Sequence, residues 1–154
     1  MSKARELLRK IKTCLGGFER ARPGPDRVTY RDLGKGQHRF FCGSPRVQGT
    51  PSRGFVFKKT GRILIFELFA EEVDGGLQWK SFAIHLSGIG EARIMFHKDP
   101  DAARWPEHPE THIQFDAPQE VVRAAPFLAW RLPLGEIDPI RCIEYAVARG
   151  IGPD

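Results

Sequence analysis

Short runs of strand-forming residues, separated by glycine-containing turns, dominate the chain between residues 27 and 116. Phe, Ile, Val and Tyr recur in these runs, and such residues favour β-strands. Consecutive hairpins leave little room for parallel βαβ units, so the pattern predicts an antiparallel meander. The expected strands are Arg27–Asp32, His38–Cys42, Phe55–Lys59, Arg62–Glu71, Leu77–Leu86, Glu91–His97 and Thr111–Phe115, with hairpin turns at Lys59-Thr60-Gly61 and Asp74-Gly75-Gly76.

A helix is expected on each side of this meander. Residues 2–15 carry apolar residues at spacings of three and four, with Ser2 as N-cap and Gly16 after the last turn. Near the other end, Asp138 is an N-cap, Pro139 suits the first helical position and Gly150 is expected to stop the helix. The sequence therefore predicts an α+β fold, an antiparallel β-sheet meander flanked by N- and C-terminal helices.

The length of 154 residues predicts a single α+β domain over 1–154. Its expected parts are a basic helix and linker (1–26), a sheet (27–116) and a C-terminal helical part (117–154). No apolar run approaches the roughly 18 residues of a membrane span, and the N-terminus lacks the apolar centre of a secretory signal. Three cysteines without C-x-x-C spacing argue against a disulfide framework or a zinc ribbon. A cytoplasmic location without membrane partners is expected.

Charge is divided along the chain. Residues 1–62 hold 16 Lys/Arg against four Asp/Glu, a net +12, whereas residues 63–154 carry a net −7. A basic half attracts polyanions, of which nucleic acid is the commonest inside cells. Two other interpretations remain open: the halves neutralise each other on one surface, or they dock a protein partner with an acidic face.

Histidines and carboxylates gather between residues 97 and 112. His97, His108 and His112 lie there with Asp99, and such side chains bind divalent metals or transfer protons. His108, His112 and Asp99 are the candidate catalytic residues, and a metal site and metal-free acid–base use both remain open. The alternative is a solvated, proline-rich loop. His85 lies on the polar face of its expected strand and is either half-exposed there or part of a cluster with a neighbouring strand.

Basic residues also alternate with aromatic ones, in Tyr30-Arg31, Arg39-Phe40-Phe41 and Phe55–Lys59. Sheet aromatics beside cations can stack single-stranded bases, although phenylalanines in strands are commonly core residues. The candidate nucleic-acid-binding residues are Lys58, Lys59, Arg62, Arg39 and Arg31.

Glu67 and the sequence Gln78-Trp79-Lys80 flank the Asp74–Gly76 turn. A carboxylate followed by Glu/Gln-x-Lys on the next strand resembles the metal-dependent restriction-endonuclease-like nucleases. The alternative is an amphipathic hairpin with a cross-strand ion pair.

The segment from Arg62 to Phe115 resembles the TumE-type toxins of prokaryotic toxin–antitoxin systems. The matching stretches are Ile84-His85, Met95–Asp99 and His108–Phe115. The resemblance implies a small toxin-like protein with an antitoxin partner, and active positions at Asp99, His108 and His112.

Together these observations predict a small intracellular prokaryotic protein that binds or cleaves nucleic acid, as a toxin of such a system would. The competing hypothesis is a non-enzymatic adaptor or assembly subunit that docks a protein partner through its charged halves.

Overall fold

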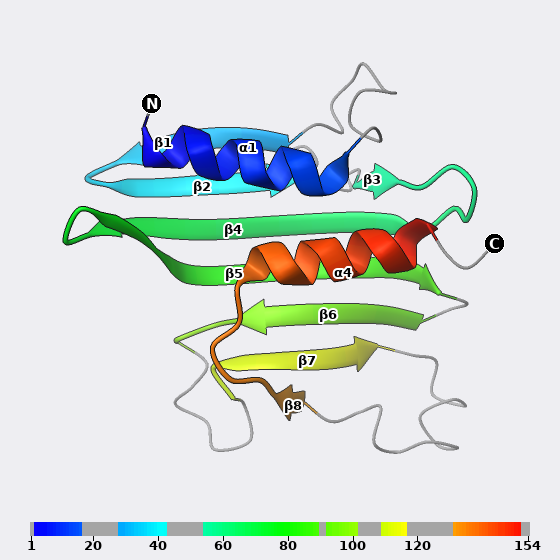
Figure 1. Ribbon diagram of the computed structural model, residues 1–154. Helices are drawn as coiled ribbons and strands as arrows, with labels where there is room; N and C mark the ends of the chain where they lie inside the picture. The colour runs from blue at the N-terminus through cyan, green and yellow to red at the C-terminus, as the bar shows by residue number, and fades with distance from the viewer. Residues whose placement is uncertain are drawn as a thin grey trace, which may run out of the picture.

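The computed structural model describes residues 2–16, 28–42, 54–89, 92–101, 109–116 and 131–151. Within these ranges, two helices and eight strands are arranged as in Figure 1. In chain order they are α1 (Lys3–Leu15), β1 (Val28–Gly34), β2 (Gln37–Cys42), β3 (Phe55–Val56), β4 (Ile63–Val73), β5 (Gly76–Ile89), β6 (Ala92–Lys98), β7 (Thr111–Asp116), β8 (Arg131–Pro133) and α4 (Pro139–Ile151).

The strands form one antiparallel sheet in the order β1-β2-β4-β5-β6-β7-β8. The short strand β3 lies outside this order and pairs with β4 along the same edge as β2. This confirms the expected α+β meander. Two hairpins turn through pairs of residues with positive φ, Lys35 with Gly36 and Asp74 with Gly75. Such pairs match the right-handed twist of the strands that they join. The tight turns therefore keep successive strands adjacent.

Alternation along the strands divides the sheet into two faces. In β4, Leu64, Phe66, Leu68 and Ala70 are buried, whereas the residues between them are partly exposed. Both helices cover the face that carries these four residues (Figure 1), which we call the helical face. The other face carries no helix among the described residues and is called the open face.

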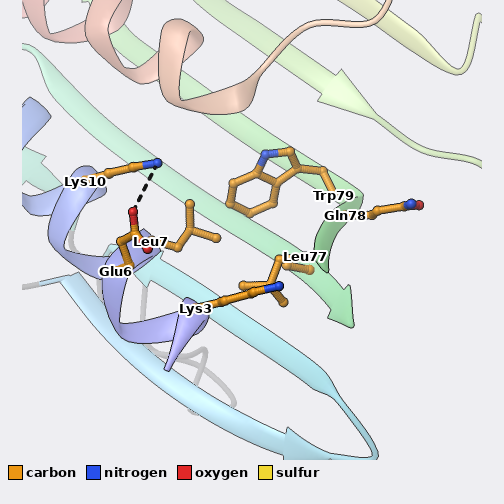
Figure 2. Close-up of a pocket in the computed structure, with 8 residues that line it drawn as sticks. Lys3, Glu6, Leu7, Lys10, Leu77, Gln78 and Trp79 are labelled. Atoms are coloured by element: carbon orange, nitrogen blue, oxygen red, sulfur yellow. Dashed lines mark ion pairs between the residues drawn. The ribbon is translucent and has the colours of Figure 1, made fainter. Parts of the chain in front are cut away.

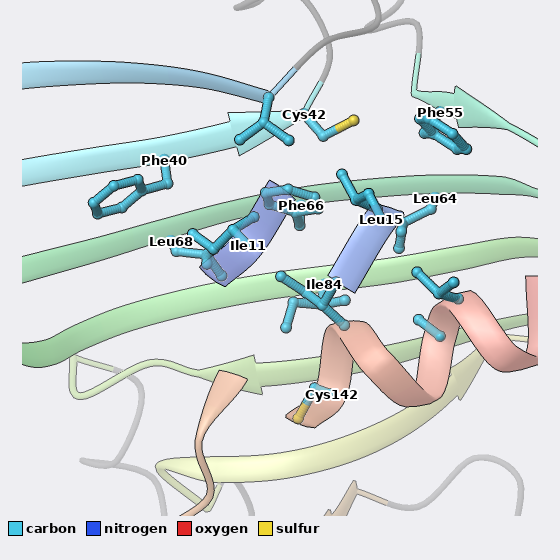
Figure 3. Packing of buried hydrophobic residues seen from close by; sticks show 14 of the residues in the cluster. Ile11, Leu15, Phe40, Cys42, Phe55, Leu64, Phe66, Leu68, Ile84 and Cys142 are labelled. Atoms are coloured by element: carbon cyan, nitrogen blue, oxygen red, sulfur yellow. The ribbon is translucent and has the colours of Figure 1, made fainter. Parts of the chain in front are cut away.

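The core lies between the helical face and the two helices. Ile11 and Leu15 of α1 and Cys142 of α4 meet the apolar side chains of β2, β4 and β5 there (Figure 3). Each large apolar side chain buried in this layer contributes about 1.5–3 kcal/mol. The amphipathic stripes expected in the sequence thus hold both helices on one side of the sheet.

The ends of the helices follow their capping residues, with one correction. The Ser2 side chain accepts a hydrogen bond from the Arg5 backbone, and Asp138 Oδ1 accepts one from the Ile140 backbone at 3.0 Å. Gly150 does not stop the second helix as expected, because it lies inside α4, which continues to Ile151. A Cβ on Gly150 would overlap the Phe57 ring, so the glycine allows close packing there.

One further boundary and one further strand differ from expectation. β3 ends at Val56 because Lys58-Lys59-Thr60 forms the turn to β4, closed by a 2.7 Å bond from the Gly61 amide to the Phe57 carbonyl. β8 has no counterpart among the expected strands; it pairs with β7 through only three residues. The interval 117–130, whose sequence pattern is ambiguous, lies outside the described residues. Within the described part of the chain, neither helix combines the length and apolar character that crossing a membrane requires.

Candidate functional site

Three histidines from three neighbouring strands line up on the open face. The sheet register places Ala83 of β5 opposite His97 of β6, and His97 opposite His112 of β7. His85 lies two residues after Ala83, on the same face and diagonal to His97. The ring centroids of His85 and His97 are 5.0 Å apart, and those of His97 and His112 are 5.2 Å apart. We call these three residues the histidine row.

His85 and His97 are in direct hydrogen-bonding contact, with their Nε2 atoms 2.7 Å apart. One ring must donate and the other accept. Burial, and to a lesser extent the positive charge of Arg93, lowers the pKa of His85. With His85 neutral and its Nε2 lone pair facing His97, the Nε2–H of His97 donates across the contact. His85 is placed to stabilise a charged His97.

His112 is fully buried and its orientation is fixed. Its Nδ1 lies 2.9 Å from the Pro109 carbonyl oxygen, which can only accept. Nδ1 therefore carries a hydrogen, and Nε2 is the lone-pair nitrogen of the neutral ring. His112 cannot touch a substrate in this conformation. It packs edge-on against His97 and holds that ring in place.

His97 lines a cavity of about 330 Å³ on the open face. This volume lies at the small end of the range of ligand pockets in proteins. Lys98 and Asp99, which follow His97 in the chain, also line this cavity. Lys98 is held by a 3.0 Å hydrogen bond from Nζ to the Trp79 carbonyl oxygen. The complete lining is Glu67, Phe69, Ser81, Phe82, Ala83, His97, Lys98 and Asp99. We call this pocket the His97 cavity.

Two of the three predicted catalytic residues, Asp99 and His112, lie in or beside this site. Asp99 lines the His97 cavity, and its backbone amide donates to the Glu110 carbonyl at 2.8 Å, joining the end of β6 to the start of β7. His112 lies behind His97, whereas His108 lies outside the described residues. The sequence does not predict the His85–His97 contact. Strand alternation places His85 on this face, but only the register between β5 and β6 brings the two rings together.

The predicted nucleic-acid-binding residues form two separate groups. Arg31 and Arg39 are register partners on the open face, and both guanidinium groups lie over the Phe41 ring, at 5.6 and 4.5 Å from its centroid. Arg39 also contacts Phe69 and forms an ion pair with Glu67.

Lys58, Lys59 and Arg62 lie instead at the turn between β3 and β4. The Arg62 guanidinium donates there to the Arg149 carbonyl oxygen at the end of α4. Phe69, the register partner of Arg39, is seven residues after Arg62 along the chain. At the usual strand rise this offset places Arg62 about 23 Å from Phe69. The five cations therefore do not make a single patch.

The restriction-endonuclease-like arrangement of Glu67, Gln78 and Lys80 is not formed. Glu67 lies opposite Ala83, whereas the register partner of Gln78 is Glu71. Lys80 Nζ lies 3.8 Å from a carboxylate oxygen of Glu71. A bulge between Phe69 and Ala70 shifts the pairing in this part of the hairpin. The alternative, an amphipathic hairpin with a cross-strand ion pair, describes the structure.

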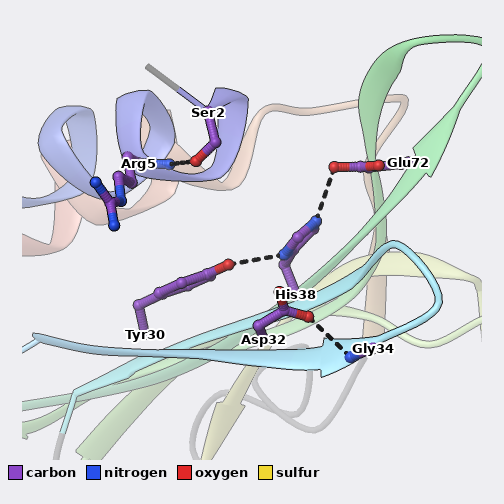
Figure 4. A network of polar contacts seen from close by, with 7 residues as sticks. All are labelled: Ser2, Arg5, Tyr30, Asp32, Gly34, His38 and Glu72. Carbon is purple, nitrogen blue, oxygen red and sulfur yellow. Dashed lines mark hydrogen bonds and ion pairs between the residues drawn. The ribbon is translucent and has the colours of Figure 1, made fainter.

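A second polar network lies on the helical face near α1 (Figure 4). Buried His38 sits between Tyr30 and Glu72, with its Nε2 3.2 Å from a Glu72 oxygen and its Nδ1 3.0 Å from the Tyr30 hydroxyl. Because a carboxylate can only accept, Nε2 carries the hydrogen and the neutral ring accepts from Tyr30 at Nδ1. Burial raises the pKa of Tyr30, with nearby Asp32 adding to the shift. A phenolate is thus disfavoured, and the network links β1, β2 and β4 structurally.

A groove on the helical face is centred on Trp79. Cavities of about 260, 440 and 520 Å³ all include this indole in their lining. Figure 2 shows the first of them, where Leu7 of α1 lies beside Trp79 and the Lys10–Glu6 ion pair stands at the rim. The other two extend towards the start of α4 and the end of β6. We call this surface the Trp79 groove.

Among the described residues, no three or more His, Cys, Asp or Glu side chains are grouped so as to hold a metal ion. No family model, curated protein or solved structure matches this chain.

Proposed function

We propose that this protein binds RNA and cleaves its phosphodiester backbone, with His97 as the residue that transfers protons. The observation that carries this proposal is the His85–His97 contact at the wall of the His97 cavity. A histidine that lines a cavity and whose charged form is supported by a second ring suits general acid–base chemistry near neutral pH.

RNA suits such a site because it carries its own nucleophile. His97 takes the proton of a 2′-hydroxyl as the 2′-oxygen forms a bond to the adjacent phosphorus. The bond from phosphorus to the 5′-oxygen then breaks, and His97 returns the proton to that oxygen. The products are a 2′,3′-cyclic phosphate and a 5′-hydroxyl, so atoms and charge balance without an added nucleophile. His85 accepts a hydrogen bond from Nε2–H of His97 while His97 is charged.

Cations on the same face support binding of the phosphate backbone. Arg31 and Arg39 lie along the open face, whereas Lys98 pairs in register with the buried Phe82 and its Nζ donates to the Trp79 carbonyl oxygen, on the helical side of the cavity. Because backbone binding releases counterions from the nucleic acid, the affinity should fall as salt is raised. The proposed role extends to a toxin held by an antitoxin, in line with the resemblance of residues 62–115 to TumE-type toxins.

The test is incubation of the purified protein with labelled single-stranded RNA, single-stranded DNA and duplex DNA, over a salt series and with and without chelator. Salt-sensitive binding, and cleavage of RNA to cyclic-phosphate ends whether or not chelator is present, are expected. His97→Gln should lose the cleavage, while Lys80→Gln, a change in an exposed lysine that pairs with Glu71, should keep it. If no substrate is cleaved, or if His97→Gln cleaves like the wild type, the proposal fails. Cleavage abolished by chelator would assign the chemistry to a metal instead.

The Trp79 groove favours a second function, docking of a protein partner without turnover. Aromatic side chains in grooves are common anchors of protein interfaces, and Lys3 and Lys10 on its rim would favour an acidic partner segment. A stoichiometric protein band that co-purifies with the wild type and is lost with Trp79→Ala would support docking. Retention of that band by the variant would exclude the groove as its site.

A further inference from the structure

We infer that the nucleic acid bound on the open face is a single strand that crosses the sheet from the His97 cavity to Arg39 and Arg31. This inference rests on the proposed function for the chemistry at His97, but its binding geometry can be tested separately. It names the substrate class as unpaired RNA several nucleotides long.

The sheet register supplies the path. One row of directly paired residues runs across four strands on the open face: Phe41 of β2, Glu67 of β4, Ala83 of β5 and His97 of β6. Three inter-strand steps separate the two ends of this row, which is about 14 Å at the usual strand spacing. About four stacked nucleotides of a strand would span that distance, at the roughly 3.4 Å rise of a stacked base.

Arg39 is held at the far end of this path. Its guanidinium group forms an ion pair with Glu67 and lies over the Phe41 ring at 4.5 Å and near the Phe69 ring at 5.7 Å. These contacts fix the plane of the group and reduce the ordering that binding would require. Arg31, the register partner of Arg39, is exposed and also lies over the Phe41 ring. We call Arg31, Arg39, Phe41 and Phe69 the arginine shelf.

The arginine shelf and the His97 cavity are continuous. Glu67 and Phe69 contact Arg39 and also line the cavity that contains His97. Phe69, Ser81 and His97 are all partly exposed along this boundary. Pairing with Arg39 neutralises the Glu67 carboxylate, which would otherwise repel the phosphates. An RNA strand whose reacting phosphate lies at His97 would therefore reach the guanidinium groups of the arginine shelf a few nucleotides further along.

Exposed guanidinium planes recognise unpaired bases, because a base in a duplex is already stacked and paired. Phe41 is buried beneath the two arginines, so a base on the shelf would meet Arg31 and the exposed part of Arg39. A duplex would offer only its phosphates to Arg31 and Arg39. The shelf consequently favours single strands over duplexes and longer strands over dinucleotides. The chemistry that it recognises is the face of a base next to a phosphate, with no preference set by base edges.

The test measures binding and cleavage separately for wild type, Arg39→Lys, Arg31→Gln and Lys80→Gln. Binding is measured with a hexanucleotide RNA whose 2′-hydroxyls are all methylated, so that it keeps its phosphates but cannot be cleaved, as a single strand and as a duplex. Cleavage is measured with the ordinary hexanucleotide and with a dinucleotide. Circular dichroism of each variant checks that the fold is retained.

Wild type should bind the single strand more tightly than the duplex. Arg39→Lys keeps the charge but loses the planar group, so its affinity for the single strand should fall about tenfold, with a smaller loss for the duplex. Arg31→Gln should fall in the same direction, and Lys80→Gln should match wild type. The preference in kcat/KM for hexanucleotide over dinucleotide should shrink in both shelf variants.

The outcomes separate the two proposals. Equal binding of single strand and duplex, or wild-type affinity and length preference in both shelf variants, overturns the path across the sheet even if RNA is cleaved. Single-strand binding that depends on Arg39 without any cleavage keeps the path and rejects the proposed chemistry at His97.

Discussion

The Nε2 atoms of His85 and His97 lie 2.7 Å apart, although twelve positions separate the two residues in the chain. The contact spans two adjacent antiparallel strands and is diagonal rather than directly cross-strand, because His97 faces Ala83 and His85 faces Met95. Burial makes His85 the poorer site for charge. The geometry therefore assigns unequal roles to two residues of the same type.

The lowered pKa of His85 predicts a loss of stability in acid. The unfolded chain takes up a proton at this residue near its ordinary pKa of 6.5, whereas the folded protein does so only at lower pH. Between those two values the unfolded state binds more protons, so the free energy of unfolding falls as the pH decreases. Urea unfolding at pH 7.5 and 5.5 should show a larger decrease for wild type than for His85→Gln. Identical decreases would mean that His85 does not contribute.

His112→Ala should destabilise the fold. The side chain is fully buried and donates to the Pro109 carbonyl, so its removal leaves a cavity and an unsatisfied acceptor. A loss of about 2–4 kcal/mol is expected, in the range of large-to-small core substitutions. Glu110→Ala, a change in an exposed neighbour, should stay within about 0.5 kcal/mol of wild type. Equal stability of the two variants in urea would contradict the burial of His112.

Gly150→Ala should also destabilise the protein, although alanine is the better helix former. The new methyl group would overlap the Phe57 ring. Such overpacking typically costs about 1–3 kcal/mol and exceeds the roughly 1 kcal/mol gain in helix propensity. Gly135→Ala is the control, since its methyl group would meet nothing within 4 Å. Adding Phe57→Leu to Gly150→Ala should restore part of the stability lost, as measured by the midpoint of thermal unfolding. An unchanged midpoint would show that overlap with Phe57 is not the cause.

The cysteine thiols should react slowly in the folded protein. Burial raises the pKa of Cys142 to about 12, and burial together with Glu144 raises that of Cys14. The thiolate is the reactive species, so at pH 8 both thiols are almost entirely protonated. Labelling with a chromogenic disulfide at pH 8 should be much slower in native protein than in urea. Rapid native labelling that mass spectrometry locates at Cys142 would be inconsistent with the core packing.

Tyr30→Phe should weaken the network around His38. The variant keeps the ring but removes the hydroxyl that donates to Nδ1, at a cost of about 1 kcal/mol. Tyr145→Phe makes the same chemical change at an exposed position of α4 and should have an effect below about 0.5 kcal/mol. The difference between the two midpoints of urea unfolding measures the hydrogen bond. Matching midpoints would show that the hydroxyl contributes no net stability.

The fold was largely predictable because its signals are local. The alternation of apolar residues in β4, the caps at Ser2 and Asp138, and the Asp74-Gly75 turn each act over a few residues. The three-residue strand β8 has too short a pattern to be recognised. The position of Gly150 within α4 was missed because its cause is Phe57, a residue distant in the chain.

The site was only partly predictable. Composition singled out the stretch from His97 to His112, and alternation alone assigned His85 to the open face. Which histidines meet depends on the register of three strands, and a shift by one residue would move a side chain to the opposite face. In the same way, the sequence supplied Arg31, Arg39 and Phe41 as an aromatic–basic pattern, but not their continuity with the His97 cavity.

By itself the sequence determined the antiparallel sheet, the two helices that flank it, and the types of residue available for chemistry. The tertiary structure alone decided that His97 lies between His85 and His112, that Glu67 pairs with Arg39 rather than joining Gln78 and Lys80, and that Lys58 and Lys59 lie far from the arginine shelf. The physical reason is the distance along the chain over which each effect acts. Propensity, capping and alternation act between neighbours in the chain, whereas strand register is set by the packing of the whole sheet against its helices.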